Sequence, residues 1–263
     1  MALDLVLREY EAAGRQIRVG MVGAGATGRA IALQLGTPVP GMRLVALANR
    51  PLANAERAFR EANIHGWTRA STAREADSAI ARGIPVLTED PSVLTACEAI
   101  DIILEVTGTV EAGAAVVLDA IAHRKHVVMV NAELDSLIGP ILNEKAREAG
   151  VVLTNTDGDE PGVAMTLLRY LRTLGLKPVA AGNIKGMVDY YRNPDTQRAF
   201  AEKNDQDPRK VTSFADATKL SMETTVLANA TGFRAGRRGM YGPACKDVRE
   251  VAQRLPAQAM LET

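Results

Sequence analysis

Cysteine, histidine and aromatic residues are scarce in this sequence. Its 263 residues include two cysteines, Cys97 and Cys245, which lie far apart and form no C-x-x-C pair. That spacing argues against a disulfide framework or a zinc knuckle, and we expect both thiols to be reduced and buried. The three histidines show no metal-ligand spacing, and the carboxylates match no metal motif, so we predict no metal site.

An excess of one charge and a long apolar run are also missing. Lysine and arginine balance aspartate and glutamate at 31 residues each, and aromatic residues make up 4% of the chain. A chain without net charge and with few stacking side chains does not favour nucleic acid or an anionic membrane as a partner. No run approaches the roughly 18 apolar residues that a membrane span needs, and segment 1–15 is not a signal peptide. We therefore expect a cytoplasmic protein.

One short motif carries more information than any other stretch. Residues 17–28 read IRVGMVGAGATG, in which a β-rich run leads into G-x-G-x-x-G and an apolar helical pattern follows at once. In such a turn Gly23 allows the tight bend, Gly25 lets the backbone approach a pyrophosphate, and Gly28 lets the helix pack on the strand. The N-terminus of the helix then faces the phosphates. We predict a dinucleotide site formed by Gly23, Gly25, Ala26, Thr27 and Gly28.

Strand-like and helical segments alternate after this motif. The strand-like runs are 42–49, 85–87, 102–106, 126–130 and 151–155, and the helical ones are 53–62, 67–83, 91–99, 110–124 and 137–149. Strands that alternate with helices of about 10 to 15 residues indicate a parallel sheet with helices on both faces. We predict an α/β fold, a Rossmann-type doubly wound parallel sheet that binds NAD(P) and covers residues 1–156.

The character of the chain changes at DGDEPG, residues 157–162, which we take as a domain boundary. Beyond it the patterns predict a helix over Val163–Leu174, a strand over Pro178–Lys185, a polar loop, and a longer helix over about Phe214–Ala230. Residues 157–263 are therefore expected to form a second, smaller α+β domain for substrate binding and catalysis. The chain ends without a recognisable closing element, and we expect that a C-terminal region is missing.

The end of the second predicted strand bears on the choice of cofactor. A dinucleotide fold selects NAD by placing a carboxylate on the adenosine ribose here, but the sequence reads ANRP over residues 48–51, without an acid. Asn49 is placed to hydrogen-bond the ribose, and Arg50 to pair with a 2′-phosphate. We therefore predict NADP in preference to NAD. The alternative is that Arg50 is a solvated loop residue.

Two further strand ends are predicted to face the nicotinamide half of the cofactor, because open α/β sheets bind ligands at the carboxyl ends of their strands. Thr107 and Gly108 follow the strand at 102–106, and Asn131 follows the next one. Glu133 is either part of this site or a first-turn helix residue favoured by the helix dipole. Both interpretations remain open.

Several segments of the chain carry a resemblance to a known family. They are GAGATG at 23–28, DIILEVTG at 101–108, VNAE at 130–133 and GNIKGMVDY at 182–190. On these segments the chain resembles the homoserine dehydrogenase-like family of NAD(P)-dependent oxidoreductases. The stretch 203–233 resembles a related branch more closely, the deoxyxylulose phosphate reductoisomerase-like enzymes. The resemblance implies a homodimer built on the second domain and an acidic-and-lysine constellation that includes Glu202, Asp216 and Lys219.

Two places depart from the pattern of this family. Homoserine dehydrogenases follow the strand-end asparagine with a catalytic lysine, whereas Asn131 is followed here by Ala132 and Glu133. Lys185 and Asp189 stand where the family usually shows uncharged amides. The simplest interpretation is a substrate other than homoserine.

The second domain offers candidates for the chemistry. Hydride transfer at a carbonyl needs a group that stabilises or protonates the developing alkoxide, and Lys219 is the first candidate. Asp216 lies three residues earlier on a predicted helix, where it either orients Lys219 or forms only an exposed ion pair with it. Lys185 either binds a substrate carboxylate or phosphate or is a solvent-facing lysine at a strand end. Glu202 is a candidate for lining the cleft.

Together these residues predict an NAD(P)(H)-dependent oxidoreductase that interconverts an alcohol and a carbonyl on a small anionic, oxygen-rich substrate. Two alternatives remain open. One is a reductoisomerase that converts a ketose phosphate with NADPH, and the other is a non-catalytic NAD(P)-binding sensor or regulatory protein.

Overall fold

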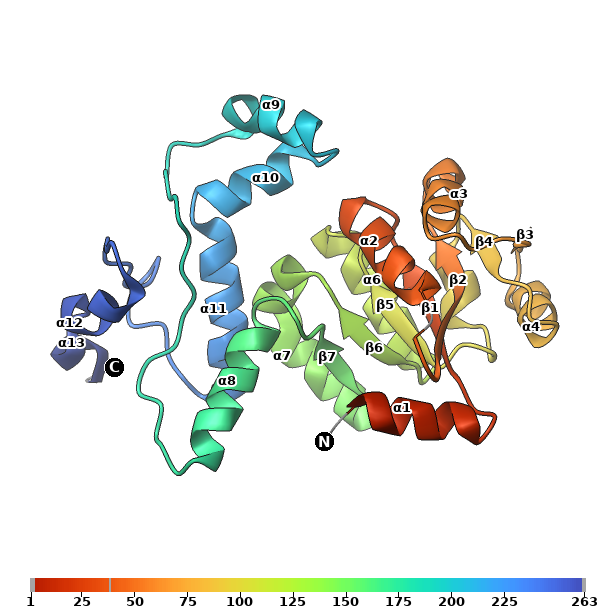
Figure 1. Cartoon of the computed structure of the whole chain (residues 1–263), viewed down its shortest axis with the longest axis horizontal. Helices are drawn as coiled ribbons and strands as arrows, with labels where there is room; N and C mark the ends of the chain where they lie inside the picture. The colour runs from red at the N-terminus through yellow and green to blue at the C-terminus, as the bar shows by residue number, and fades with distance from the viewer. Residues whose placement is uncertain (1–2, 38, 262–263) are drawn as a thin grey trace. The chain divides into compact units, whose positions relative to one another are not determined.

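The computed structural model describes residues 3–37 and 39–261, which form two compact units (Figure 1). The first unit is the chain up to Leu134 together with Ile138–Thr154. The second unit is Asp135–Leu137 together with the chain from Asn155 onwards. Each unit is described below by itself.

The first unit alternates strands and helices. Its strands are β1 (Ile17–Val22), β2 (Met42–Ala48), β3 (Thr68–Arg69), β4 (Val86–Thr88), β5 (Ile102–Glu105), β6 (His126–Met129) and β7 (Leu153–Asn155), whose last residue falls in the second unit. Its helices are α1 (Leu3–Ala12), α2 (Ala26–Gly36), α3 (Leu52–Glu61), α4 (Ala73–Ala81), α5 (Pro91–Thr95), α6 (Val110–Ala122) and α7 (Ala132–Ala149). The predicted helix at 67–83 is shorter than expected, because its first residues form the edge strand β3 and Thr72 caps α4 by accepting a hydrogen bond from the Glu75 N–H.

The strands form one sheet in the order β3-β4-β2-β1-β5-β6-β7. β1 pairs in parallel with β2 on one side and with β5 on the other, and the β2–β4, β3–β4 and β5–β6 pairs are parallel too. The direction of winding reverses at β1, so the carboxyl ends of β1 and β5 flank a topological switch point, where such sheets bind ligands. The prediction of a doubly wound α/β sheet is confirmed.

Apolar residues of the strands alternate between two cores, one on each face of the sheet. In β5, Ile103 packs in one cluster with Val117 of α6, whereas the next residue, Leu104, packs in the other cluster with Phe59 of α3. Burial on both faces explains why the strands read as continuous apolar runs in the sequence.

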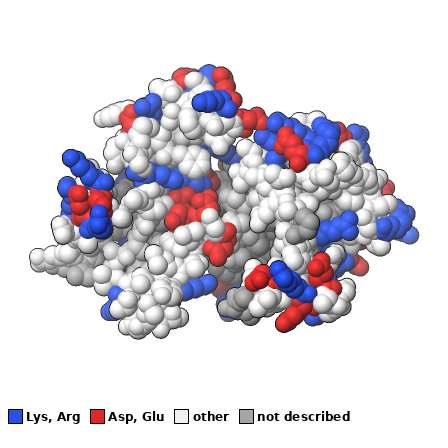
Figure 2. All heavy atoms as spheres, viewed as in Figure 1, with Lys and Arg blue, Asp and Glu red and all other residues white. Residues whose placement is uncertain are grey.

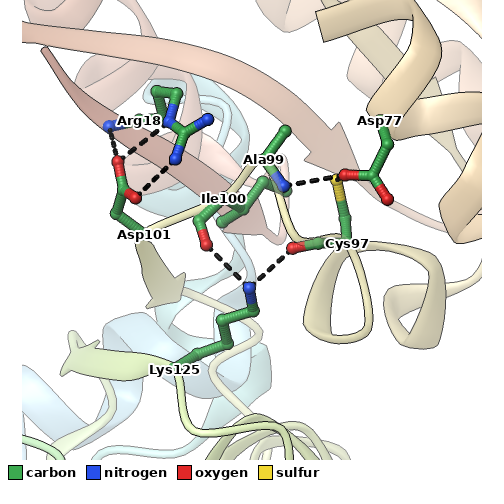
Figure 3. Close-up of polar contacts among 7 residues, drawn as sticks. All are labelled: Arg18, Asp77, Cys97, Ala99, Ile100, Asp101 and Lys125. Carbon is green, nitrogen blue, oxygen red and sulfur yellow. Dashed lines mark hydrogen bonds and ion pairs between the residues drawn. The ribbon is translucent and has the colours of Figure 1, made fainter. Parts of the chain in front are cut away.

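Charged and polar residues tie the amino ends of the strands together, at the edge opposite the switch point (Figure 3). The Arg18 guanidinium donates two hydrogen bonds to Asp101, of 2.8 and 3.1 Å, and so links the starts of β1 and β5. The Lys125 ammonium, before β6, donates to the backbone oxygens of Cys97 and Ile100 at 2.6 and 2.8 Å. These hydrogen bonds hold the amino ends of the strands in place.

Cys97 belongs to the same polar cluster. Its thiol is buried and lies 3.0 Å from the Oδ1 atom of Asp77, to which it donates a hydrogen bond. Burial, reinforced by the neighbouring carboxylate, raises the pKa of the Cys97 thiol to about 12. Because the thiolate is the reactive form, Cys97 is an unreactive structural residue.

The second unit is built mainly from helices in its described residues. They are α8 (Gly162–Thr173), α9 (Pro194–Lys203), α10 (Pro208–Ala215), α11 (Thr218–Thr231), η1 (Val248–Glu250), α12 (Val251–Arg254) and α13 (Ala257–Leu261). The strand predicted over Pro178–Lys185 is not formed, since these residues are neither helix nor strand. A strand needs a hydrogen-bonded neighbour, and the described residues of this unit beyond β7 contain none. The predicted polar loop contains α9 and α10.

The described helices include none that is long and apolar enough to cross a membrane. Figure 2 shows lysine and arginine side chains interspersed with aspartate and glutamate on the face in view. Over α3 this mixture reflects ion pairs, such as Arg57 with Glu61 and Arg60 with Glu56. The surface in view therefore carries no field of a single sign.

Candidate functional site

The turn between β1 and α2 explains two of the three motif glycines by packing. Gly23 has a φ of 113°, and a Cβ atom there would lie 2.4 Å from the backbone oxygen of Val106. A Cβ atom on Gly28 would lie 2.3 Å from the backbone oxygen of Gly23. Both positions therefore require glycine whether or not a ligand binds.

Gly25 is different, because nothing in the protein requires glycine there. Its φ of −68° suits any residue, and no neighbouring heavy atom lies within 4 Å of the position of a Cβ. Gly25 is the N-cap of α2, and no side chain caps this end, so the N–H groups of Ala26 and Thr27 begin the helix without such a partner. Open space in front of an uncapped helix N-terminus fits a pyrophosphate.

Asn49, at the end of β2, braces the glycine turn. Its Oδ1 atom accepts a hydrogen bond from the Ala24 N–H at 2.9 Å, and its Nδ2 atom donates to the Pro51 oxygen at 2.9 Å. The Asn49 side chain thus makes two contacts within the protein, and its hydrogen bond to the ribose stays a prediction. Arg50, the next residue, is exposed.

Glu105 organises the strand ends on the other side of the switch point. This fully buried carboxylate accepts hydrogen bonds from the Thr107 N–H at 2.8 Å and from the Thr107 hydroxyl at 2.5 Å. The Asn131 amide approaches the same oxygen at 3.4 Å and donates to the Thr109 oxygen at 2.9 Å. Glu105 thereby fixes the loop that contains Thr107 and Gly108. Our sequence argument missed this role, although a lone acid in the apolar run IILEV was a visible signal.

Asn131 is wholly buried, and its Oδ1 atom caps α7 by accepting the Leu134 N–H at 3.1 Å. Its side chain is thus committed to the protein, and a contact with the cofactor stays a prediction. Glu133 lies in the first turn of α7, since this helix begins at Ala132. Its first-turn position is thereby observed, while a role in the site stays a prediction.

A second group of polar residues lies in the second unit, around Glu223 of α11. Glu223 is 3% exposed, and the Asn183 amide donates to its Oε2 atom at 2.5 Å. Burial raises the pKa of Glu223, against the opposing charges of Lys219 and Lys185. The two ammonium groups lie 5.7 and 5.6 Å from the centre of the same Phe214 ring. The structure thus brings Lys185 and Lys219 together near Glu223, a residue that our sequence analysis did not single out.

Asn183 carries a further feature of this group. Its Oδ1 atom is buried and has no hydrogen-bond partner among the described residues. A buried acceptor without a donor is costly, so this atom suits a hydroxyl group on a ligand.

The two predicted acids make other contacts. Asp216 does not share a helix with Lys219, because α10 ends at Ala215 and Ala217 has a φ of 74°. The Asp216 carboxylate instead accepts hydrogen bonds from the Thr218 N–H, at 2.9 Å, and from the Thr218 hydroxyl, at the start of α11. Glu202 is exposed on α9, where its charge acts on Arg198.

Comparison with known families identifies the first unit. Residues 23–154 match the family described as the NAD binding domain of homoserine dehydrogenase. The chain belongs to this family. Residues 158–262, outside the homoserine dehydrogenase match, match the catalytic domain of the oxidoreductase DRL. The resemblance stated from the sequence is confirmed, and the chain is a member of an NAD(P)-binding oxidoreductase family.

Solved structures of the homoserine dehydrogenase family and of other oxidoreductases are similar to part of the chain. A homoserine dehydrogenase from Thiobacillus denitrificans is 28% identical, with 57% of this chain and 30% of that chain covered and a TM-score of 0.39. An NAD binding oxidoreductase from Klebsiella pneumoniae is 19% identical, with 61% and 39% covered and a TM-score of 0.43. The matches thus span about a third of these proteins. None of the curated proteins matches the chain.

Proposed function

We propose that this chain is an NAD(P)-dependent oxidoreductase that interconverts an alcohol and a carbonyl on a small anionic substrate. The observation that carries the proposal is the group around Glu223, in which Lys185 and Lys219 approach one aromatic ring beside a buried carboxyl group. This group lies in the part of the chain that matches a catalytic domain. Two cations beside a buried carboxyl group suit a negatively charged substrate whose oxygen changes its protonation state.

The first unit supplies the residues that would hold the cofactor. The start of α2 binds the pyrophosphate through the N–H groups beyond Gly25. The exposed Arg50 pairs with a 2′-phosphate, and this is our reason for preferring NADP to NAD. A bound nicotinamide dinucleotide supplies or accepts the hydride.

The second unit supplies the proton and holds the substrate. In the direction of reduction, the Lys219 ammonium gives a proton to the oxygen on which negative charge develops. Glu223 lies four residues along the same helix, and its buried carboxyl group, whose pKa burial raises, is our candidate for returning the proton to Lys219. Lys185 pairs with the anionic group of the substrate, and the Asn183 Oδ1 atom accepts a hydrogen bond from a neighbouring hydroxyl.

The test is hydride transfer, measured by the absorbance of the reduced cofactor over a panel of sugar acids, hydroxy acids and sugar phosphates. We expect Lys219→Met to lower kcat by roughly a hundredfold or more, because it removes the proton donor. Lys185→Met is expected chiefly to raise KM. Lys203→Met, on the exposed surface of α9, is the matched control and leaves both constants unchanged.

Three results would change this assignment. Full activity of Lys219→Met would remove Lys219 from the mechanism. Turnover of a ketose phosphate that depends on an added divalent metal would favour reductoisomerase chemistry. Binding of the nucleotide without turnover of any substrate in the panel would favour the sensor interpretation.

A further inference from the structure

The end of β2 lacks an acid, but the neighbouring strand supplies one. β4 pairs in parallel with β2, and Glu89 follows it directly. The Glu89 Oε1 atom accepts a hydrogen bond of 2.9 Å from the N–H of Leu52, the first residue of α3. A carboxylate therefore lies at the N-terminus of the helix that follows Asn49 and Arg50.

The two strand ends are joined at this place. The Asn49 N–H donates to the Thr88 oxygen at 3.0 Å, so the residues after β2 and those after β4 lie side by side. Asn49 in turn braces the glycine turn through Ala24, at 2.9 Å. Glu89 thus lies at the edge of the sheet where the adenosine half of a dinucleotide is expected to bind.

The position of Glu89 has an electrostatic consequence. In dinucleotide folds a carboxylate at the end of the second strand binds the ribose 2′-hydroxyl of NAD, and Glu89 follows the strand that pairs with β2. The Glu89 carboxylate repels a 2′-phosphate and occupies the Leu52 N–H, a donor that a phosphate at the start of α3 would use. Arg50 acts in the opposite sense, since its positive charge attracts the phosphate.

We propose that Glu89 is a specificity-determining residue of the dinucleotide site, which weakens the binding of NADP and supports the binding of NAD. The inference rests on the cofactor part of the proposed function and assigns a carboxylate that the sequence motif does not contain. The ratio of the affinities for NADP and NAD accordingly depends on two opposing charges: Arg50 favours NADP, and Glu89 favours NAD.

The test measures binding by isothermal titration calorimetry and needs no substrate. The Kd values of NADP and NAD are compared in the full chain and in Glu89→Gln. The glutamine keeps an oxygen for the Leu52 N–H, so α3 stays capped while the charge is lost. We expect the Kd of NADP to fall roughly tenfold and the Kd of NAD to rise severalfold. Glu89→Asp keeps the charge and retains the wild-type ratio.

Asp90 provides the matched control. This neighbouring carboxylate caps a different helix, α5, by accepting the Ser92 N–H at 2.9 Å. Asp90→Asn removes a charge one residue away and keeps a good capping group, so the ratio of the two Kd values should change by less than about twofold.

Each outcome decides one question. If both nucleotides bind and the ratio is the same in Glu89→Gln as in the full chain, Glu89 has no role in specificity and the proposed function stands. If neither nucleotide binds to the full chain, both proposals are wrong. Should Glu89→Gln fail to fold, Glu89→Ser removes the same charge and must give the same change in the ratio.

Discussion

Gly28 and Gly25, in the turn between β1 and α2, have different roles, which the addition of one methyl group at each position distinguishes. At Gly28 a Cβ atom meets the backbone of Gly23 at 2.3 Å, whereas at Gly25 it meets no neighbouring atom within 4 Å. We expect Gly28→Ala to lower the free energy of unfolding by about 1–3 kcal/mol, as overpacking does. We expect Gly25→Ala to change it by less than about 0.5 kcal/mol and to weaken NADP binding by roughly tenfold or more.

Thermal unfolding and nucleotide titration of both variants check this contrast. The comparison is internal, because the same methyl group is added to two positions of one motif. Equal NADP affinity of Gly25→Ala and the wild type would show that the open space before α2 is not the phosphate site. An unchanged stability of Gly28→Ala would show that the helix can shift away from β1.

Residue by residue, the sequence predicted glycine positions better than side-chain roles. A G-x-G-x-x-G turn is specified locally by its backbone conformation and by the close approach of neighbouring backbone segments. Its geometry could therefore be predicted from six residues. The partners of a side chain depend on distant segments. The contact of Asn49 with Ala24 was not predicted, and Glu105 and Glu223 acquire their partners only once the chain has folded.

At the scale of elements, alternation of strand and helix in the first unit was predictable because both faces of each strand are buried. The second unit was not predictable in the same way. The run Pro178–Lys185 has strand composition, yet strand formation needs a pairing partner that composition does not reveal. The predicted helix over Phe214–Ala230 is broken because Ala217 is left-handed and the Asp216 carboxylate accepts the Thr218 N–H.

Asp216 lies at the break between α10 and α11, where its role is either structural or catalytic. Two variants distinguish these roles. If the carboxylate only accepts the Thr218 N–H, Asp216→Asn keeps stability and activity, because asparagine caps equally well. Asp216→Ala should then lower the free energy of unfolding by about 1 kcal/mol. Denaturant unfolding and the hydride-transfer assay are measured on both variants. A large loss of kcat in the stable Asp216→Asn variant would restore the catalytic role that the family resemblance implies.

The link between β1 and β5 through Arg18 and Asp101 predicts a dependence of stability on pH. Burial opposes ionisation of Asp101, but the hydrogen bonds from Arg18 outweigh it and lower the pKa of the carboxyl group. A pKa that is lower in the folded state gives stability that is present above the unfolded value of about 3.9 and is lost as the pH falls through the folded value.

We expect Asp101→Asn to lower the free energy of unfolding at pH 7 by about 1 kcal/mol, a modest value because the two side chains are 41% and 37% exposed. The difference between variant and wild type should shrink as the pH falls below about 4, which urea unfolding at a series of pH values measures. Glu144→Gln, in an exposed pair with Arg147, is the control for the loss of a carboxylate elsewhere in the chain. A constant difference across this range would contradict the assignment.

Over the whole molecule, the two units differ in how much apolar surface they bury. The two large apolar clusters of the described residues lie in the first unit. The buried apolar residues described in the second unit are Leu168, Ala201, Val211, Ala215, Val226 and Leu227. Large side chains such as Tyr190 and Tyr191 are 72% and 91% exposed. A homodimer, which the family resemblance implies, remains our expectation for this unit and is measurable by sedimentation.

Unequal cores, together with the cofactor site that we propose in the first unit, predict that heat unfolds the chain in two steps. A nucleotide that binds the folded first unit at a hundred times its Kd stabilises that unit by about 2.7 kcal/mol. We expect the corresponding calorimetric transition to rise by roughly 5–10 °C, while the transition of the second unit stays in place. Gly25→Ala is the control, because tenfold weaker binding at the same nucleotide concentration leaves a stabilisation of only about 1.4 kcal/mol and therefore about half the rise. A single transition that moves as a whole with NADP would instead mean that the two units unfold as one.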